Sequence, residues 1–387
     1  MKILSYAWVI HDDKIQKFAG NCTGGGVVIK NICEYIGRKE KSFLFIGKYK
    51  LPQMKLGNIN IVASDTLDLL EDKNYSDIEA HIHNMCINFK KALDNIKPDI
   101  VNFHGIGEMT MRCIDICKQF KIPFVFTEHL YIGLNKDFDG YDTTVEWEKQ
   151  LYSLPDVNII TVSTGMKNKI LNDYPQISKD RIKTIINGTD FKPIFYHNEI
   201  SDVFKLKSKK VFMCVGTISE RKNQMQIVRV FELLPRRIKA EITVVFCGND
   251  SMNGKLQYYI NQKGLRDRLI YVGGVSSEKM KEYYTVANGL LMPSKSEGLS
   301  IASLEAIAYG LPVLMYRDSE CAPDLNDENV ICFAEDRSDG AVMEALIKMY
   351  NHKWDKDYII NYSKKYTMEH MADNYLEVYR NIIENKE

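Results

Sequence analysis

Short apolar runs alternate with longer segments of helical period along the first half of the chain. The apolar runs predict buried strands at residues 3–9, 42–46, 100–103, 124–127 and 159–162. Segments with apolar residues at helical spacing predict helices at 27–36 and 78–96. Strands that alternate with helices in this way are typical of a doubly wound parallel sheet.

The same alternation starts again after a charged, loosely patterned stretch at 192–210, which we interpret as an interdomain linker. Further strands are expected at 211–215, 242–247, 269–272, 289–292, 312–315 and 330–333, and helices at 224–233, 254–263, 277–286, 301–309 and 339–350. An amphipathic helix at 367–383 ends the pattern. We therefore expect Rossmann-like domains at 1–195 and 196–365, followed by a C-terminal helical segment at 366–387.

Composition excludes several classes of function. The 387 residues are 45% hydrophobic and 26% charged, with a formal net charge of zero that divides almost evenly between the halves. Neither half has the basic excess of a nucleic-acid binder, and no apolar run is long enough to cross a bilayer. Acidic residues follow MKILSYAWVI where a signal peptide would be cleaved, so this stretch is interpreted as a strand. The cysteines lack CxxC spacing, which favours buried thiols in a reducing cytoplasm.

The stretch SEGLSIASLEAIAYGLPVL, residues 296–314, carries two carboxylates at the start of a predicted helix. If Ser300 caps that helix, Glu305 lies along its apolar face, where it requires hydrogen-bond donors from neighbouring groups or from a ligand. Glu297 precedes the helix in a turn with Gly298. The N–H groups of Leu299 and Ser300 lie there at the positive end of the helix dipole, and such a helix start is suited to bind an anion.

The longer segment PSKSEGLSIASLEAIAYGLPV, residues 293–313, resembles the E-x7-E segment of the family 4 retaining glycosyltransferases, which have the two-domain GT-B fold. The resemblance implies two doubly wound Rossmann-like domains that face a central cleft. It also implies that Glu297 binds hydroxyls of the donor sugar and that Glu305 holds the ribose hydroxyls. The backbone of Gly298, Leu299 and Ser300 would receive the diphosphate.

Other segments of the second half resemble the same family. In VGTISERKN, residues 215–223, Lys222 follows Gly216 at the spacing of the family's diphosphate-binding lysine. The arginine that usually follows this glycine is Thr217 here, and Arg221 is a candidate replacement; a solvated helix start is the plainer interpretation of the two cations. In RLIYVGGVSSEKMKEYYTVANGLLMPS, the backbone from Gly273 to Val275 is where the nucleotide base is expected.

The first half also resembles the family. TGGGVVIKNI, residues 23–32, is similar to the glycine loop that lies against the donor phosphates and the acceptor, which implicates Gly24, Gly25 and Gly26. PDIVNFHGIGEM, residues 98–109, places His104 at a strand end, where the family has a histidine near the sugar and acceptor; Asn102 replaces the usual preceding histidine. FTEHLY, TVSTGMKNKI and IINGTD follow in the expected order. The final helix, with Tyr366 and Tyr379, resembles the segment that crosses back to the first domain.

One acidic motif suggests a metal, because Asp137, Phe138 and Asp139 have the form of a DxD metal site. The motif lies in a polar loop of the first domain, away from the expected diphosphate site, and GT-B enzymes that resemble this chain generally need no metal. We therefore expect neither a metal nor a cofactor.

The resemblance implies a hexosyltransferase that moves a sugar from a nucleotide-diphosphate sugar to an acceptor hydroxyl with retention at the anomeric carbon. His104, Lys222 and Glu297 would be the catalytic residues. The acceptor would be a glycan or a lipid-linked glycan of bacterial surface polysaccharide synthesis. The expected location is cytoplasmic, and peripheral contact with the inner face of the membrane is left open. Alternatives are another GT-B enzyme, such as an epimerase or a phosphorylase, and an inactive nucleotide-sugar-binding scaffold subunit.

Overall fold

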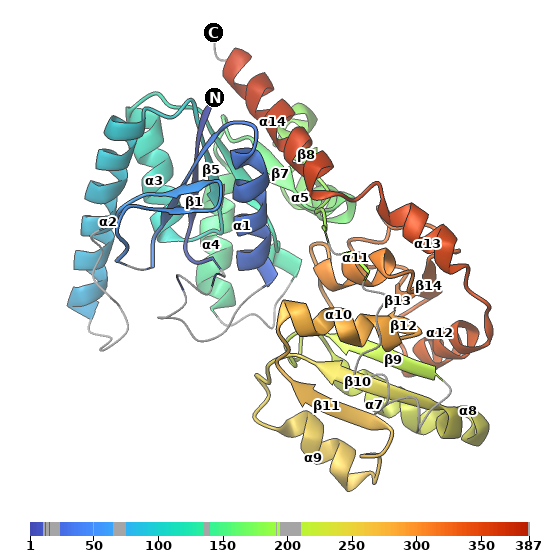
Figure 1. Ribbon diagram of the computed structural model, residues 1–387. Helices are drawn as coiled ribbons and strands as arrows, with labels where there is room; N and C mark the ends of the chain where they lie inside the picture. The colour runs from blue at the N-terminus through green and yellow to red at the C-terminus, as the bar shows by residue number, and fades with distance from the viewer. Residues whose placement is uncertain are drawn as a thin grey trace. The chain divides into compact units, whose positions relative to one another are not determined.

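The computed structural model describes residues 1–10, 12, 15, 24–48, 50–64, 75–134, 140–190, 192–193 and 210–385. These residues form two compact units, each a sheet flanked by helices (Figure 1). Unit 1 is Met1–Asn187 with Met368–Glu387, and unit 2 is Gly188–Thr367. Most of the linker expected at 192–210, and the Asp137–Asp139 motif, lie outside the described residues.

The sheet of unit 1 is parallel except at one edge. Its strands are β1 (Lys2–Ala7), β2 (Lys41–Ile46), β3 (Met54–Leu56), β4 (Ile59–Ile61), β5 (Ile100–His104), β6 (Phe124–Glu128), β7 (Ile159–Thr161) and β8 (Ile182–Thr184), in the order β3-β4-β2-β1-β5-β6-β7-β8. Only β3 and β4 pair antiparallel. The predicted parallel α/β sheet is confirmed, whereas β3, β4 and β8 were not predicted because Lys55, Asn60 and Lys183 interrupt their short apolar runs.

Helices cover the sheet of unit 1: α1 (Gly24–Gly37), α2 (Tyr75–Ile96), α3 (Glu108–Gln119), α4 (Tyr141–Tyr152) and α5 (Thr164–Asp173), with single turns η2 (Ile132–Leu134) and η3 (Lys179–Arg181). The core is aromatic beside β1. The ring of Tyr6 lies 5.6 Å from that of Phe103 and 6.2 Å from those of Phe45 and Phe89, between centroids. These rings fasten α2 to the sheet strands.

The last helix, α14 (Met368–Glu384), belongs to unit 1 and packs along α1 (Figure 1). Its inner face carries Tyr375 and Tyr379, both fully buried. Asn102 on β5 donates from Nδ2 to the hydroxyl of Tyr379 at 2.7 Å. Arg38 and Lys39 form ion pairs with acidic residues of α14 at the surface. Helix α14 is therefore part of the core of unit 1.

The sheet of unit 2 is wholly parallel. Its strands are β9 (Lys210–Val215), β10 (Ile242–Cys247), β11 (Leu269–Gly273), β12 (Gly289–Leu291), β13 (Val313–Tyr316) and β14 (Ile331–Ala334), in the order β11-β10-β9-β12-β13-β14. The chain moves outward from β9 to β11, returns to the middle at β12 and moves outward in the other direction. The doubly wound prediction is confirmed.

The helices of unit 2 are α7 (Gln224–Leu233), α8 (Arg236–Glu241), α9 (Lys255–Gln262), α10 (Ser277–Val286), α11 (Ile301–Ala308), α12 (Asp339–Asn351) and α13 (Lys356–Ser363). They enclose a core of branched and aromatic residues on both faces of the sheet, which suits strands buried on two sides. The predicted bounds of α7 and α10 agree with the structure at both ends.

Two further findings concern the chain as a whole. No disulfide joins the cysteines of the described segments, and all of these cysteines except Cys86 are buried. Within the same segments, no helix is both long enough and apolar enough to span a bilayer.

Candidate functional site

The point where the strand order reverses lies between β9 and β12 of unit 2. In doubly wound sheets, ligands bind outside the carboxyl ends of the strands at such a switch point. The loop after β9 spans residues 216–223, and the loop after β12 spans residues 292–300. These loops carry Arg221, Lys222 and Glu297, which the sequence singled out from segments more than 70 residues apart.

Two glycines shape the loop after β9. Gly216 has φ +134°, and a Cβ there would lie 3.2 Å from Cε and 3.5 Å from Nζ of Lys222, so its lack of a side chain lets the lysine fold over the backbone. Gly248, at the end of β10, has φ +153°, and a Cβ there would lie 2.0 Å from the carbonyl oxygen of Gly216. Thr217 is exposed. The close packing of β9 and β10 thus determines where Lys222 lies.

Glu297 pairs with both cations. Its Oε1 forms an ion pair with Nζ of Lys222 and lies 3.3 Å from Nη1 of Arg221. Glu297 is 8% exposed. Burial alone would raise the pKa of this carboxyl, but the charges of Lys222 and Arg221 outweigh burial and hold the pKa below its ordinary value. Glu297 is therefore ionised at neutral pH, and the cluster of these three side chains carries one net positive charge.

Sequence reasoning missed Glu320, a further carboxylate of this site. It follows β13, and its Oε2 accepts a hydrogen bond from the backbone N–H of Glu297 at 3.1 Å. Burial raises the pKa of Glu320, and the charge of Glu297 adds to that rise. The signal was available in principle, because Asp318 to Cys321 follow a strand that neighbours β12. Without the strand order, however, nothing distinguished this loop.

Helix α11 begins as predicted. Ser300 is its N-cap, with the side-chain oxygen accepting from the N–H of Ser303 at 3.3 Å. Gly298 and Leu299 lie directly before this start, and Leu299 and Ser300 are buried. The structure therefore places the backbone expected to receive the diphosphate beside Glu297 and Lys222.

Glu305 lies on the inward face of α11, as the helical period predicts. The hydroxyl of Tyr284 on α10 donates to its Oε2 at 3.0 Å. Burial raises the pKa of Glu305 to about 7, the Tyr284 bond opposes the rise, and the charge of Asp190 adds to it. The residue keeps partial exposure, so a ligand can reach it. Tyr284 is a donor that sequence reasoning missed, because it comes from a different helix.

The expected base position lies at the end of β11, two strands away from β9. Gly273 has φ +78° and open space where a Cβ would point, and its carbonyl oxygen accepts from the N–H of Gly248 at 2.8 Å. The next residue, Gly274, packs against the side chain of Asn249, and Val275 is half-buried. Glycines thus line the carboxyl edge of three adjacent strands, which leaves the backbone open to a flat ligand.

In unit 1, the predicted residues lie at the corresponding edge. His104 ends β5, next to β1, where the strand order of that sheet reverses. Gly24, Gly25 and Gly26 form the first turn of α1, so this helix begins three residues earlier than expected.

His104 has a partner that the sequence did not reveal. Its Nδ1 lies 2.9 Å from Nε2 of His129, which follows β6, and the two rings stack with centroids 5.2 Å apart. Burial lowers the pKa of His104 well below its ordinary value, and His129 adds to this; burial lowers the pKa of His129 to about 4. Both rings are uncharged at neutral pH. Nε2 of His104 is buried and has no hydrogen-bond partner among the described residues.

Two buried glutamates of unit 1 hold the turn after β6. Glu128 precedes His129 and accepts from the hydroxyl of Tyr152, while Glu148 on α4 accepts from the N–H groups of Ile132 and Gly133 at 2.6 and 3.1 Å. Burial raises the pKa of Glu128 to about 7 and that of Glu148 to about 8. These glutamates close the turn after β6 and were not predicted from the sequence.

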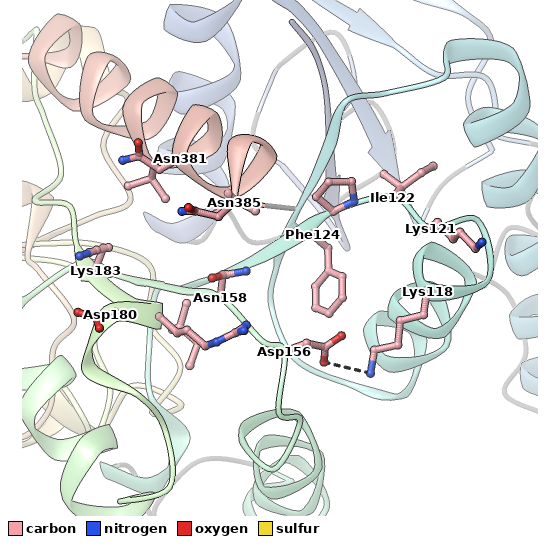
Figure 2. A pocket seen from close by; sticks show the side chains of 15 residues that line it. Lys118, Lys121, Ile122, Phe124, Asp156, Asn158, Asp180, Lys183, Asn381 and Asn385 are labelled. Carbon is pink, nitrogen blue, oxygen red and sulfur yellow. Dashed lines mark ion pairs between the residues drawn. The ribbon is translucent and has the colours of Figure 1, made fainter. Parts of the chain in front are cut away.

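A cavity of about 820 Å³ opens at the opposite edge of the same sheet (Figure 2). Phe124 and Ile159, the first residues of β6 and β7, form part of its wall, and Asn381 of α14 faces it. Lys118 and Asp156 at its rim lie 3.5 Å apart. Because it lies at the amino ends of the strands, this cavity is separate from the edge that carries His104.

The described residues contain no group of three or more histidine, cysteine or acidic side chains arranged to hold a metal ion. Asp137 and Asp139 lie outside the described segments.

Two family models match the chain. The model described as glycosyl transferases group 1 matches residues 197–366, and the model described as Glycosyltransferase Family 4 matches residues 76–192. Together they extend over the sequence on both sides of the boundary between the units.

Curated proteins with similar sequences are also glycosyltransferases. An uncharacterized glycosyltransferase of Methanocaldococcus jannaschii is 22% identical over 57% of this chain and 59% of its own length. An alpha-monoglucosyldiacylglycerol synthase of Streptococcus pneumoniae is 24% identical over 67% of this chain and 62% of its own length. O-antigen chain mannosyltransferase B of Escherichia coli is 26% identical over 40% of this chain and 42% of its own length. The chain spans about half the length of the curated relatives that it matches.

Solved structures share the fold. A sucrose-phosphate synthase of Thermosynechococcus elongatus superposes with a TM-score of 0.76 at 14% identity and covers all of both chains. WaaG, a glycosyltransferase involved in lipopolysaccharide biosynthesis, gives 0.71 at 15% identity over 97% of this chain and 99% of its own. Anabaena HepE, in complex with UDP and glucose, gives 0.70 at 11% identity over 98% of this chain and all of its own.

Proposed function

The chain belongs to the family 4 glycosyltransferases of GT-B fold, and from this premise we propose that it transfers a sugar from a nucleotide-diphosphate sugar to an acceptor hydroxyl, with retention at the anomeric carbon. The observation that carries the proposal is the cluster of Lys222, Arg221 and Glu297 at the switch point of unit 2. Cations beside a helix start are the groups that a departing diphosphate requires.

The leaving group sets the chemical difficulty. As the bond between sugar and diphosphate breaks, negative charge grows on the phosphate oxygens and positive charge on the sugar. Lys222, Arg221 and the backbone at Leu299 and Ser300 stabilise the negative charge in this proposal. Arg221 supplies the charge that is absent at Thr217, because its guanidinium reaches Ser296 and Glu297 in the neighbouring loop.

Glu297, in the loop before α11, and Glu305, on α11, have different roles in this proposal. Glu297 is an ionised acceptor for hydroxyls of the donor sugar, and its ion pairs make it a poor nucleophile. Retention is therefore assigned to front-face attack by the acceptor, assisted by the leaving phosphate. Glu305, with one donor from Tyr284 and partial exposure, accepts from the ribose hydroxyls. The backbone from Gly273 to Val275 takes the base.

Unit 1 supplies the acceptor side. His104 is uncharged, and its Nε2 has no hydrogen-bond partner in the part of the chain that the structure describes, so this atom is suited to a hydrogen bond with the donor sugar or the acceptor. Gly24, Gly25 and Gly26 permit close approach of the ligand to the start of α1. No step of the proposal requires a metal or a cofactor.

The names of the relatives support a proposal for the acceptor class. The matched proteins include an O-antigen chain mannosyltransferase and glycolipid synthases. We therefore assign a glycan or lipid-linked glycan acceptor, with the protein in the cytoplasm and in peripheral contact with the inner face of the membrane.

The test begins with a thermal-shift screen of nucleoside diphosphates and their sugars, in which a ligand at 100 times its Kd stabilises by about 2.7 kcal/mol. The sugar that binds is then assayed for transfer, with Lys222→Met and Glu297→Gln as site variants and Lys255→Met as the control. Lys255 is an exposed lysine of unit 2 that pairs with Glu220. The expected loss of kcat in Lys222→Met is about 10²–10³-fold. Full activity in both site variants would contradict the site assignment, and an inverted product would contradict retention.

A further inference from the structure

Two loops of unit 2 hold the charged groups of the proposed donor site. The loop after β9 presents Lys222 and the loop after β12 presents Glu297. They are joined directly, because the N–H of Lys295 donates to the carbonyl oxygen of Arg221 at 2.8 Å and Nη1 of Arg221 donates to that of Ser296 at 2.7 Å. The separation of the two charged groups thus depends on how the two loops are held.

Tyr316 lies behind both loops. It is the last residue of β13 and is 1% exposed. Its hydroxyl lies 2.9 Å from the carbonyl oxygen of Pro293 and also contacts Oε1 of Gln226, and it accepts from Nδ2 of Asn223 at 3.2 Å. A phenol has one proton, so the hydroxyl donates to one of these acceptors at a time or shares the proton between them. One buried hydroxyl therefore connects the loop after β12 with the loop after β9.

Asn223 gives this connection its effect on Lys222. It directly follows the lysine and has φ +54°, a left-handed conformation that residues other than glycine rarely adopt but asparagine tolerates. Its Nδ2 also contacts Oε1 of Gln226 at 3.1 Å. The side-chain amide of Asn223 is thus held by two partners, Tyr316 and Gln226. These contacts also hold the turn from which Lys222 projects.

Arg337, which follows β14, packs on the other side of Tyr316. Its guanidinium carbon lies 5.0 Å from the centre of the Tyr316 ring, and its Nη1 donates to the carbonyl oxygen of Lys295 at 2.5 Å. Its own carbonyl oxygen accepts from Nε2 of Gln226 at 2.8 Å. The ring of Tyr316 therefore has its own packing contacts, and removal of the hydroxyl alone leaves them in place.

We propose that the hydroxyl of Tyr316 is a positioning group that sets the location of Lys222 and Glu297 relative to the leaving diphosphate. The proposal rests on the proposed function. Tyr316 touches neither charged side chain; it acts through Asn223, the neighbour of Lys222, and through Pro293, at the start of the loop that carries Glu297. Sequence gave no sign of this role, because the three segments meet only through the strand order.

The test compares Tyr316→Phe with Tyr366→Phe. Tyr366 is a matched control, since it is also a buried tyrosine of unit 2 whose hydroxyl donates to a backbone carbonyl, that of Asp324, at 2.7 Å. We expect kcat of Tyr316→Phe to fall roughly tenfold or more, since a displaced cation loses part of its transition-state stabilisation. Affinity for the nucleoside diphosphate, measured by calorimetry, falls, whereas affinity for the nucleoside alone stays the same. The control changes none of these values.

A second variant addresses the network itself. Asn223→Gly keeps the left-handed backbone and removes the side-chain amide. We expect this variant to lower kcat, as Tyr316→Phe does. The double variant with Tyr316→Phe should lose less than the two single losses combined, because both changes act through one network. If Tyr316→Phe does not fold, the single Asn223→Gly variant tests whether the network positions Lys222.

The outcomes that overturn the positioning role are specific. Unchanged kcat in the folded Tyr316→Phe protein, an equal loss of nucleoside and nucleoside diphosphate affinity, or strictly additive losses in the double variant would each do so. A wild-type protein that binds no nucleoside diphosphate and transfers no sugar overturns the proposed function, with which this role falls. An active wild-type protein with unaffected variants overturns the positioning role alone.

Discussion

Replacing Lys222 by methionine isolates the electrostatics of the proposed donor site. The change keeps an unbranched side chain over Gly216 and removes the charge that pairs with Glu297. Arg221 remains 3.3 Å from the same carboxylate oxygen, which corresponds to about 5 kcal/mol of gross attraction at an effective dielectric constant near 20. Lys222 lies at least as close, so its loss removes about half of the attraction while the cost of burying Glu297 stays.

We expect the free energy of unfolding of unit 2 to fall by about 3 kcal/mol at pH 8, the lower end of the range for breaking a buried pair, because Arg221 stays. In the wild type, the pKa of Glu297 lies below its ordinary value of 4.5, so its stabilising contribution is present above that pH and is lost as the pH falls through the folded-state pKa. In the variant, burial raises the pKa of Glu297, so the penalty grows as the pH rises. The difference in the free energy of unfolding between the wild type and Lys222→Met should therefore be smaller at pH 5 than at pH 8.

Hydrogen exchange of the amides of β9 and β12 measures the opening of unit 2 separately from unit 1. Adding Glu297→Gln to Lys222→Met should recover most of the lost stability, because the buried carboxylate is then gone, whereas Arg221 is partly exposed and keeps its hydrogen bond to the carbonyl oxygen of Ser296. Lys255→Met, which breaks an exposed pair, is the control. A loss below about 1 kcal/mol, or one that is equal at both pH values, would refute the reasoning.

Three other changes test separate parts of the structure. Glu305→Ala should weaken binding of a ribonucleoside diphosphate by about 1.5–3 kcal/mol in calorimetry and leave the 2′,3′-dideoxy analogue nearly unaffected; in the wild type, ribonucleotide affinity should rise with pH through about 7, where Glu305 ionises. An equal loss for both nucleotides would contradict the ribose role. Gly248→Ala places a Cβ 2.0 Å from the carbonyl oxygen of Gly216, so denaturant unfolding should show a loss of roughly 3 kcal/mol or more, against about 1 kcal/mol for Gly254→Ala, which has a positive φ and open space. Equal losses would show that the close approach is unimportant. Tyr379→Phe should destabilise unit 1 by about 1–3 kcal/mol, because Asn102 loses its buried partner. Tyr358→Phe, at an exposed hydrogen bond of unit 2, should change the unfolding midpoint of its own unit little, and similar shifts of the two midpoints would argue against the role of burial.

Helices with clear caps and periods could be predicted from the sequence alone. Ser300 was identified as an N-cap, the apolar arc of α11 placed Glu305 inward, and the bounds of α7 and α10 agree with the structure. Helices α4 and α5 were not predicted, although Ser163 caps α5 through the N–H of Met166. Their apolar faces are narrow, so the periodic signal was weak.

Contacts that depend on the strand order could not be predicted in the same way. Three such contacts come from residues that follow or end a strand. The strand order brings Glu320 beside Glu297, His129 beside His104, and Tyr316 beside Asn223, the neighbour of Lys222. The family motifs located the charged residues along the chain. The hydrogen bonds that orient them come from segments that carry no motif.

Unit 1 is built from two separate segments of the chain, Met1–Asn187 and Met368–Glu387, and this has a consequence for biosynthesis. Domains generally fold in the order in which the ribosome releases them, beginning with the N-terminal one. Here the continuous unit, Gly188–Thr367, is released whole before α14 emerges, whereas the first 187 residues must wait for Tyr375 and Tyr379 to fill their core. During translation, Asn102 therefore lacks its tyrosine partner and the surface beneath α14 stays uncovered. A nascent chain interrupted within α14 would hold a finished second unit joined to an unfinished first one, which is the form that chaperones and proteases would recognise.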